Sequence, residues 1–213
     1  MTPSDNAWTT CSISFTPPTT PAMAAAQQPA WFQWFSLSTS EDEAQSLPPV
    51  FHVPTVEDDD YENLIKRFWD NDFIIVEHDV IPTRDQLLDM IRCPYPLCAR
   101  AVRIWPGKTG LEKPVWSARV MSSDSSAING GAESVSWRWI TEGETEADHT
   151  GFSMVKFTRV GVTGVRPFFG KGDWKDLDWR VCKALLDSRL SHPQSFPPWH
   201  IHWPEAIHIA RWS

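Results

Sequence analysis

The tripeptide Glu77-His78-Asp79 places carboxylate and imidazole side chains directly after an apolar run, residues 73–76. Four consecutive β-favouring apolar residues are typical of a strand buried on both faces, as in a parallel sheet. Ligands of open α/β sheets bind beyond the carboxyl ends of such strands. Oxygen ligands at this point suit Mg²⁺ or Mn²⁺ bridging phosphate groups, and the alternative is that the acids simply cap the next turn.

Three histidines near the end of the sequence form a second candidate site. His200, His202 and His208 lie close together, and Trp199 and Trp203 flank the first two. In an extended segment His200 and His202 point to one face, because side chains alternate. Imidazole binds Mn²⁺, Zn²⁺ or phosphate, whereas a single histidine is more often structural. The segment therefore indicates either a ligand site or a set of structural histidines.

Two further segments carry residues suited to catalysis or binding. Asp176 and Asp178 fall in the first turns of a helix expected over 174–190, where they either cap the helix or direct a carboxylate at an acceptor hydroxyl as general base. Gly151 precedes an expected strand that contains Lys156, and a glycine there lets a ligand approach the backbone. The sequence contains no Walker-type loop and no G-x-G-x-x-G, G-x-S-x-G or H-E-x-x-H motif.

The four cysteines do not make up a zinc motif by themselves. Cys93 and Cys98 have C-x4-C spacing, but neither Cys11 nor Cys182 provides a second pair to complete a zinc site. Free thiols in a reducing compartment are the simpler interpretation, and a disulfide between Cys93 and Cys98 is the alternative. The cysteine content thus favours a cytoplasmic protein.

Charge and composition exclude several classes of protein. The net charge is −8, and nine acids precede the first basic residue, Lys66. The rest of the chain is nearly neutral and has no basic block, so general nucleic-acid binding is disfavoured. No apolar run approaches the roughly 20 residues of a membrane helix. A hydrophobic content of 41% suits a globular protein.

The order of predicted elements indicates an α/β protein. Residues 1–48, rich in Ser, Thr, Pro and Ala, predict a disordered leader, and residues 49–213 predict one α/β domain. A helix over 58–69 has one apolar face, and Thr83 is the expected cap of a second helix. This alternation of helices and strands predicts a mostly parallel sheet flanked by helices.

Four segments, taken in order, resemble small GT-A-type glycosyltransferase-like proteins of bacteria and phages. The segments are FIIVEHDVIPTRDQLLDMIRCPYPLCA, GFSMVKFT, WKDLDWRVCKALLDSRL and PPWHIHWPEAIHIARW. The first contains an acidic motif of the D-x-D kind, with glutamate in place of the first aspartate. The last has the form H-x-H-x-P-x-x-x-H. The resemblance extends over the predicted domain.

The resemblance implies transfer of a sugar from a nucleotide-diphosphate donor to a hydroxyl acceptor, with Mn²⁺ or Mg²⁺ as Lewis acid. It implies a metal site formed by Asp79 with His200 or His202. Asp178 or Asp176 corresponds to the acceptor-side carboxylate. The residues assigned to the donor are Glu77, Asp79, Gly151 and Lys156.

Three other functions also fit the sequence. The first is a non-catalytic nucleotide-sugar-binding domain of the same fold. The second is a metal-dependent hydrolase built on His200, His202 and His208 together with Asp79. The third is a virion or interaction protein in which some of the 13 tryptophans form a contact surface.

Overall fold

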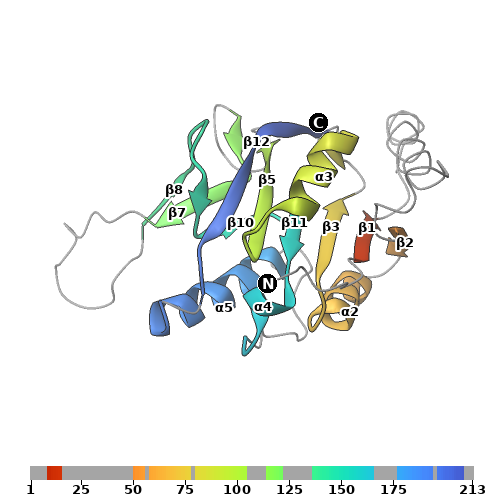
Figure 1. The fold of residues 1–213 in the computed structure, drawn as a ribbon, viewed down its shortest axis with the longest axis horizontal. Coiled ribbons are helices and arrows are strands. Elements are labelled where there is room, and N and C mark those ends of the chain that lie inside the picture. The colour runs from red at the N-terminus through yellow and green to blue at the C-terminus, as the bar shows by residue number, and fades with distance from the viewer. Residues whose placement is uncertain are drawn as a thin grey trace.

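The computed structural model describes residues 9–15, 50–55, 58–77, 80–104, 114–121, 136–165, 177–193 and 196–208 (Figure 1). These residues form a nine-stranded sheet, a three-stranded sheet and four helices. The helices are α2 (Asp58–Phe68), α3 (Arg84–Arg92), α4 (Arg159–Val162) and α5 (Leu177–Ser191).

The strands of the two sheets come from all parts of the chain. The nine-stranded sheet contains β1 (Thr9–Phe15), β2 (Val50–Thr55), β3 (Phe73–Glu77), β4 (Val80–Ile81), β5 (Leu97–Ile104), β6 (Val115–Trp116), β9 (Glu146–Ala147), β11 (Met154–Phe157) and β12 (Trp199–His208). The three-stranded sheet contains β7 (Ala118–Met121), β8 (Trp137–Trp139) and β10 (His149–Thr150).

The large sheet is mixed, with the order β2-β1-β3-β11-β5-β12-β4, while β6 pairs with β5 and β9 with β12. Strand β1 is parallel to β2 and β3, and β12 is parallel to β5; every other pairing among the described residues is antiparallel. The prediction of a mostly parallel sheet of the GT-A type is therefore wrong, since most of the strand pairings are antiparallel. The apolar residues 73–76 indicate a strand that is packed on both faces of the sheet. They do not indicate whether the neighbouring strands run parallel or antiparallel to it.

Strand β1 lies within the predicted leader, between β2 and β3 in the sheet. The expectation of disorder is therefore wrong for Thr9–Phe15. The other residues of 1–48 lie outside the described residues, so the proposed division of the chain remains a prediction.

Helix α3 begins with the expected cap. The Thr83 hydroxyl accepts from the Gln86 backbone N–H at 3.2 Å, and the Gln86 side chain accepts from the Thr83 N–H at 3.0 Å. This reciprocal arrangement is a capping box, which satisfies two backbone donors at the helix start. Helix α3 carries Asp89 to Arg100 of β5 and His202 of β12, and it ends at Cys93 beside Cys98 of β5.

Helices cover both faces of the large sheet (Figure 1). On one face, α3 packs through Leu87 and Met90 against a cluster that includes Ile74 and Cys98. On the other face, α2 and α5 pack against a larger cluster that includes Ile75. We call these the α3 face and the α5 face. Alternate residues of each central strand belong to different faces, as the pleat requires.

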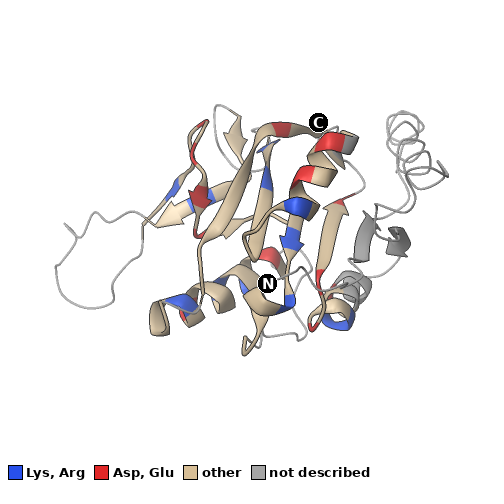
Figure 2. Ribbon diagram, viewed as in Figure 1, with Lys and Arg blue, Asp and Glu red and all other residues tan. Residues whose placement is uncertain are grey.

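Charged residues of both signs are interspersed along the described helices and strands (Figure 2). No helix in the described part of the chain has the length and apolar character needed to cross a membrane.

Candidate metal centre

Three neighbouring strands align polar side chains on the α3 face. Lys156 of β11 lies opposite Cys98 of β5, and Cys98 lies opposite His200 of β12. Two residues further along, Arg100 of β5 lies opposite His202 of β12. Because side chains two apart share a face, these residues all project toward α3. Lys156, Cys98 and Arg100 are almost completely buried there.

The second cysteine of the C-x4-C segment returns to the same point. Cys93 is the C-cap residue of α3, and its Sγ lies 2.8 Å from Sγ of Cys98. Both cysteines are buried as free thiols. The turn between them, which includes Tyr95, brings the chain from the end of the helix into β5. The helix end and the strand start therefore present two sulfur atoms side by side.

His202 completes the cluster. Its Nδ1 lies 2.9 Å from Oδ2 of Asp89, while its Nε2 is buried and has no hydrogen-bond partner among the described residues. Cys93, Cys98 and His202 each offer one potential ligand atom, and the three atoms lie within 4.8 Å of one another. Because Nδ1 is occupied by the carboxylate, Nε2 is the nitrogen that remains for the two sulfurs. A carboxylate behind a histidine in this way fixes the tautomer that leaves Nε2 unprotonated.

The two thiols differ in how readily they ionise, and Lys156 lies beside them. Nζ of Lys156 donates to the Cys93 carbonyl oxygen at 2.6 Å. The hydrogen bond from the Cys98 thiol, helped by His202, lowers the pKa of Cys93, whereas the same bond and burial raise the pKa of Cys98. One of the two thiols is therefore readily ionised, which is the state that binds metal ions and reacts with oxidants.

Arg100 holds the carboxylate that orients His202. Its guanidinium is bonded to Asp89 and donates to the carbonyl oxygens of Gln86 and Pro204, each at 3.1 Å. Burial lowers the pKa of Arg100, and Asp89 opposes that change. Burial tends to raise the pKa of Asp89, but the bonds from Arg100 and His202 outweigh it, so the pKa is lowered. Asp89 therefore stays ionised and keeps its bond to the imidazole.

The structure brings together some of the residues selected from the sequence. Lys156, His200 and His202 share the α3 face, and His200 stacks on Tyr95 with ring centroids 4.0 Å apart. The pKa of His200 is lowered, mainly by burial.

Other selected residues lie elsewhere. Asp178 belongs to α5, and a Cβ built on Gly151 would lie 3.8 Å from its Oδ2, so these two are close together on the α5 side. Glu77 ends β3, three residues beyond the row of Lys156, which is about 10 Å along the strand. Asp79 and Asp176 lie outside the described residues.

The three histidines do not form one cluster. His208 lies six residues beyond His202 on β12, and its Nδ1 contacts the Arg103 carbonyl oxygen at 3.1 Å. An extended strand of six residues spans roughly 20 Å. His208 instead lies opposite Val80 of β4, the residue that follows Glu77-His78-Asp79 in the sequence.

The cysteine pair was missed as a site because its third member lies more than 100 residues away. The C-x4-C spacing and the histidine segment were both visible signals. What links them is the parallel pairing of β5 with β12, which aligns Cys98 with His200. No local pattern in the sequence specifies that pairing.

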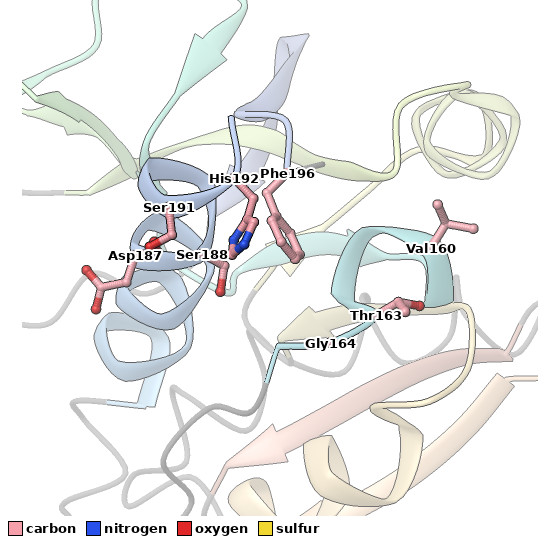
Figure 3. Close-up of a pocket in the computed structure, with 8 residues that line it drawn as sticks. All are labelled: Val160, Thr163, Gly164, Asp187, Ser188, Ser191, His192 and Phe196. Carbon is pink, nitrogen blue, oxygen red and sulfur yellow. The ribbon is translucent and has the colours of Figure 1, made fainter. Parts of the chain in front are cut away.

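A surface hollow beside α4 is a different feature. It is a groove of about 730 Å³ that lies between α4 and the end of α5 (Figure 3). Its hydroxyl groups donate within their own helices: Thr163 to Arg159 O, Ser188 to Ala184 O and Ser191 to Asp187 O. The groove therefore offers few free polar groups, and it contains none of the residues selected from the sequence.

Comparison with known proteins adds no assignment. No protein-family model matches the chain, and no curated protein sequence is significantly similar to it. The chemistry of the side chains is therefore the basis for the function considered next.

Proposed function

We propose that this chain is a zinc-binding protein in which Cys93, Cys98 and His202 hold one Zn²⁺ ion. The observation that carries the proposal is the convergence of two sulfurs and a buried imidazole nitrogen within 4.8 Å. Zinc sites use cysteine and histidine ligands in tetrahedral geometry, and a set of three protein ligands leaves one position for water or another small ligand.

The donor set favours zinc over the ions expected from the sequence. Mn²⁺ and Mg²⁺ prefer oxygen ligands, whereas thiolate sulfur selects softer ions such as Zn²⁺. Asp89 supports the same assignment, because a carboxylate bonded to the second ring nitrogen is the usual outer partner of a zinc-bound histidine. Zinc bonds of about 2.3 Å place two sulfurs about 3.8 Å apart, so the thiols would separate by about 1 Å on binding.

A disulfide between Cys93 and Cys98 is the competing state. It accounts for the closeness of the sulfurs, 2.8 Å, but it gives no role to His202. Nε2 of His202 would remain buried without a partner, which is costly for a polar group. A bound ion satisfies this nitrogen and both sulfurs at once.

The burial of the ligands favours a structural ion. Cys98 is fully buried, and the His202 side chain is 10% exposed. An ion at this position joins the connection between α3 and β5 to β12 and stabilises the centre of the sheet. Since metal binding of this kind occurs only in the folded chain, its free energy adds to folding stability.

Metal analysis of protein purified under reducing conditions tests the proposal. We expect one zinc per chain, and replacement by Co²⁺ should give the absorption of thiolate-to-cobalt charge transfer. Cys98→Ser should lose stoichiometric metal. Cys182→Ser is the matched control, because Cys182 is a buried free thiol that belongs to the α5-face cluster. Zinc retained by Cys98→Ser, or absent from the reduced wild-type protein, contradicts the proposal.

Sugar transfer from a nucleotide-diphosphate donor is the second candidate function. It is favoured by the pairing of β12 with β4, which puts His208 opposite Val80, directly after the acidic tripeptide. In this proposal Asp79 and a C-terminal histidine bind Mn²⁺ or Mg²⁺ with the donor diphosphate, and Asp178 activates the acceptor hydroxyl. This metal is separate from the zinc ion.

Asp79→Ala is expected to abolish Mn²⁺-dependent hydrolysis of nucleotide sugars without changing the fold. Turnover of UDP- and GDP-sugars is measured by release of the nucleotide, and circular dichroism checks the fold. Asp85→Ala, an acid in the first turn of α3, is the control. Unchanged hydrolysis in Asp79→Ala removes this residue from the mechanism. Binding of a donor with Mn²⁺ but without turnover in the wild type indicates the non-catalytic alternative.

A further inference from the structure

A cavity of about 180 Å³ lies between α5 and the three-stranded sheet, on the far side of the molecule's core from the cysteine pair. Its walls are mostly apolar. Six of the lining residues carry the argument: Met121, Trp137, His149, Trp179, Lys183 and Asp187. The cavity belongs neither to the zinc site nor to the sugar-transfer residues.

His149 is the one buried side chain of this cavity whose polar atoms are unused among the described residues. It is 7% exposed, and neither ring nitrogen has a hydrogen-bond partner in that part of the chain. Burial, together with the positive charge of Arg119, lowers its pKa to about 4, so the ring is neutral near pH 7. A neutral imidazole offers one N–H donor and one acceptor nitrogen. A buried group of this kind requires a partner.

Two tryptophans form the aromatic wall beside His149. Trp137 and Trp179 meet edge to face with centroids 5.4 Å apart, and the His149 ring lies 5.0 Å from Trp179. Trp179 is 37% exposed, so it stands at the rim of the cavity. Aromatic side chains in this arrangement favour flat ring systems, which they contact through their faces and edges.

The charges around the cavity are already paired. Lys183 is bonded to Asp187 at 2.6 Å on α5, and Asp148 is bonded to Arg189 and accepts from the Met121 N–H at 2.7 Å. A ligand with a net charge would therefore find no free counter-charge among these lining residues. The volume is below the range of about 300–1,000 Å³ that drug-sized ligands occupy, so the occupant is a compact one- or two-ring molecule.

We propose that this cavity binds a small, uncharged heteroaromatic ring, of the class of a nucleobase or an indole, with His149 bonded to its polar edge. A monosaccharide of similar size fits less well, since its several hydroxyl groups need more donors and acceptors than this wall provides. The ring lies against Trp137 and Trp179, and the ligand satisfies a nitrogen that the described protein leaves unpaired. The inference is independent of the zinc site, because no zinc ligand lines the cavity.

The test uses the full chain and three probes: adenine, indole and methyl glucoside. Saturation-transfer NMR and calorimetry are expected to detect binding of adenine or indole and none of methyl glucoside. His149→Phe keeps a ring of similar size and removes both nitrogens, so the affinity should fall at least tenfold. Trp179→Leu, at the partly exposed rim, should also weaken binding about tenfold without endangering the fold.

His192→Phe is the matched control, because His192 is an exposed histidine that lines the separate groove beside α4. It should bind as tightly as the wild type. The proposal is overturned if methyl glucoside alone binds, if none of the three probes binds, or if His149→Phe and Trp179→Leu both bind adenine or indole as tightly as the wild type. Metal content is measured on the same samples, so that a failure of ring binding can be told apart from a failure of zinc binding.

Discussion

Replacement of Arg100 by leucine is expected to lower the free energy of unfolding by about 3 kcal/mol. Arg100 is 2% exposed and donates to the carbonyl oxygens of Gln86 and Pro204 while it is bonded to Asp89. Leucine leaves both carbonyls without this donor in the interior. Asp89 is about half exposed, so water recovers part of its loss. Urea unfolding followed by circular dichroism measures the change.

Arg103→Leu is the control on the same strand. Arg103 is about half exposed, lies 4.0 Å from Glu205 and sits over the Trp116 ring, so its removal should cost less than about 1 kcal/mol. If Arg100→Leu does not fold, Arg100→Lys keeps the charge but cannot serve three acceptors in the same planar geometry, and it should show a smaller loss. Equal free energies of unfolding for Arg100→Leu and Arg103→Leu would show that the buried guanidinium stabilises the fold no more than the half-exposed one does.

Lowering the pH from 7 to 4 should destabilise the wild-type protein by about 3 kcal/mol through His149 alone. Its pKa is lowered to about 4 in the folded chain from the usual 6.5, because burial and the neighbouring Arg119 disfavour the charged ring. Between these two values the unfolded chain binds more protons than the folded chain. The stabilisation is therefore complete above about pH 6.5 and is lost progressively as the pH falls toward 4.

His149→Gln isolates this contribution. The variant should show a shallower fall in the free energy of unfolding over the same pH range, measured by urea titration at each pH. The charged groups on the elements around the ring are present in both proteins; they are Arg119 on β7, Asp148 beside β10, and Asp178, Lys183, Asp187 and Arg189 on α5. Parallel pH profiles for the two proteins would mean that His149 titrates normally in the folded state. In that case its burial has little energetic effect.

Local patterns in the sequence predicted several of the helices and strands. The apolar face over 58–69 became α2, the run 73–76 became the buried strand β3, and Thr83 caps α3 as expected. These patterns are reliable because the residues of a helix face or a cap are neighbours in the chain. The strand directions were not predictable in this way. Residues 73–76 face a parallel strand on one edge and an antiparallel strand on the other, and the apolar composition is the same in both cases.

The candidate site illustrates the same limit. The sequence indicated His202 as a metal ligand together with Asp79, and Lys156 as a donor-binding residue. In the structure both lie beside Cys98 instead. Cys93 and Cys98 give no zinc motif in the sequence because no second cysteine pair accompanies them. Asp89 and Arg100 showed no local signal at all, since a charged residue on a helix or strand is usually solvated. Only the alignment of β5, β11 and β12 shows that these side chains share one enclosed space.

The position of β12 has a consequence for how the chain is made. This strand, which starts at Trp199, pairs with β5 near the middle of the sheet, and β1, which ends at Phe15, lies between β2 and β3. During synthesis on a ribosome, β5 emerges about 100 residues before β12, so one edge of β5 has no partner strand over that interval. Contacts of such long sequence separation form slowly. The edge of β5 that β12 covers therefore stays unpaired until residues 199–208 have been made.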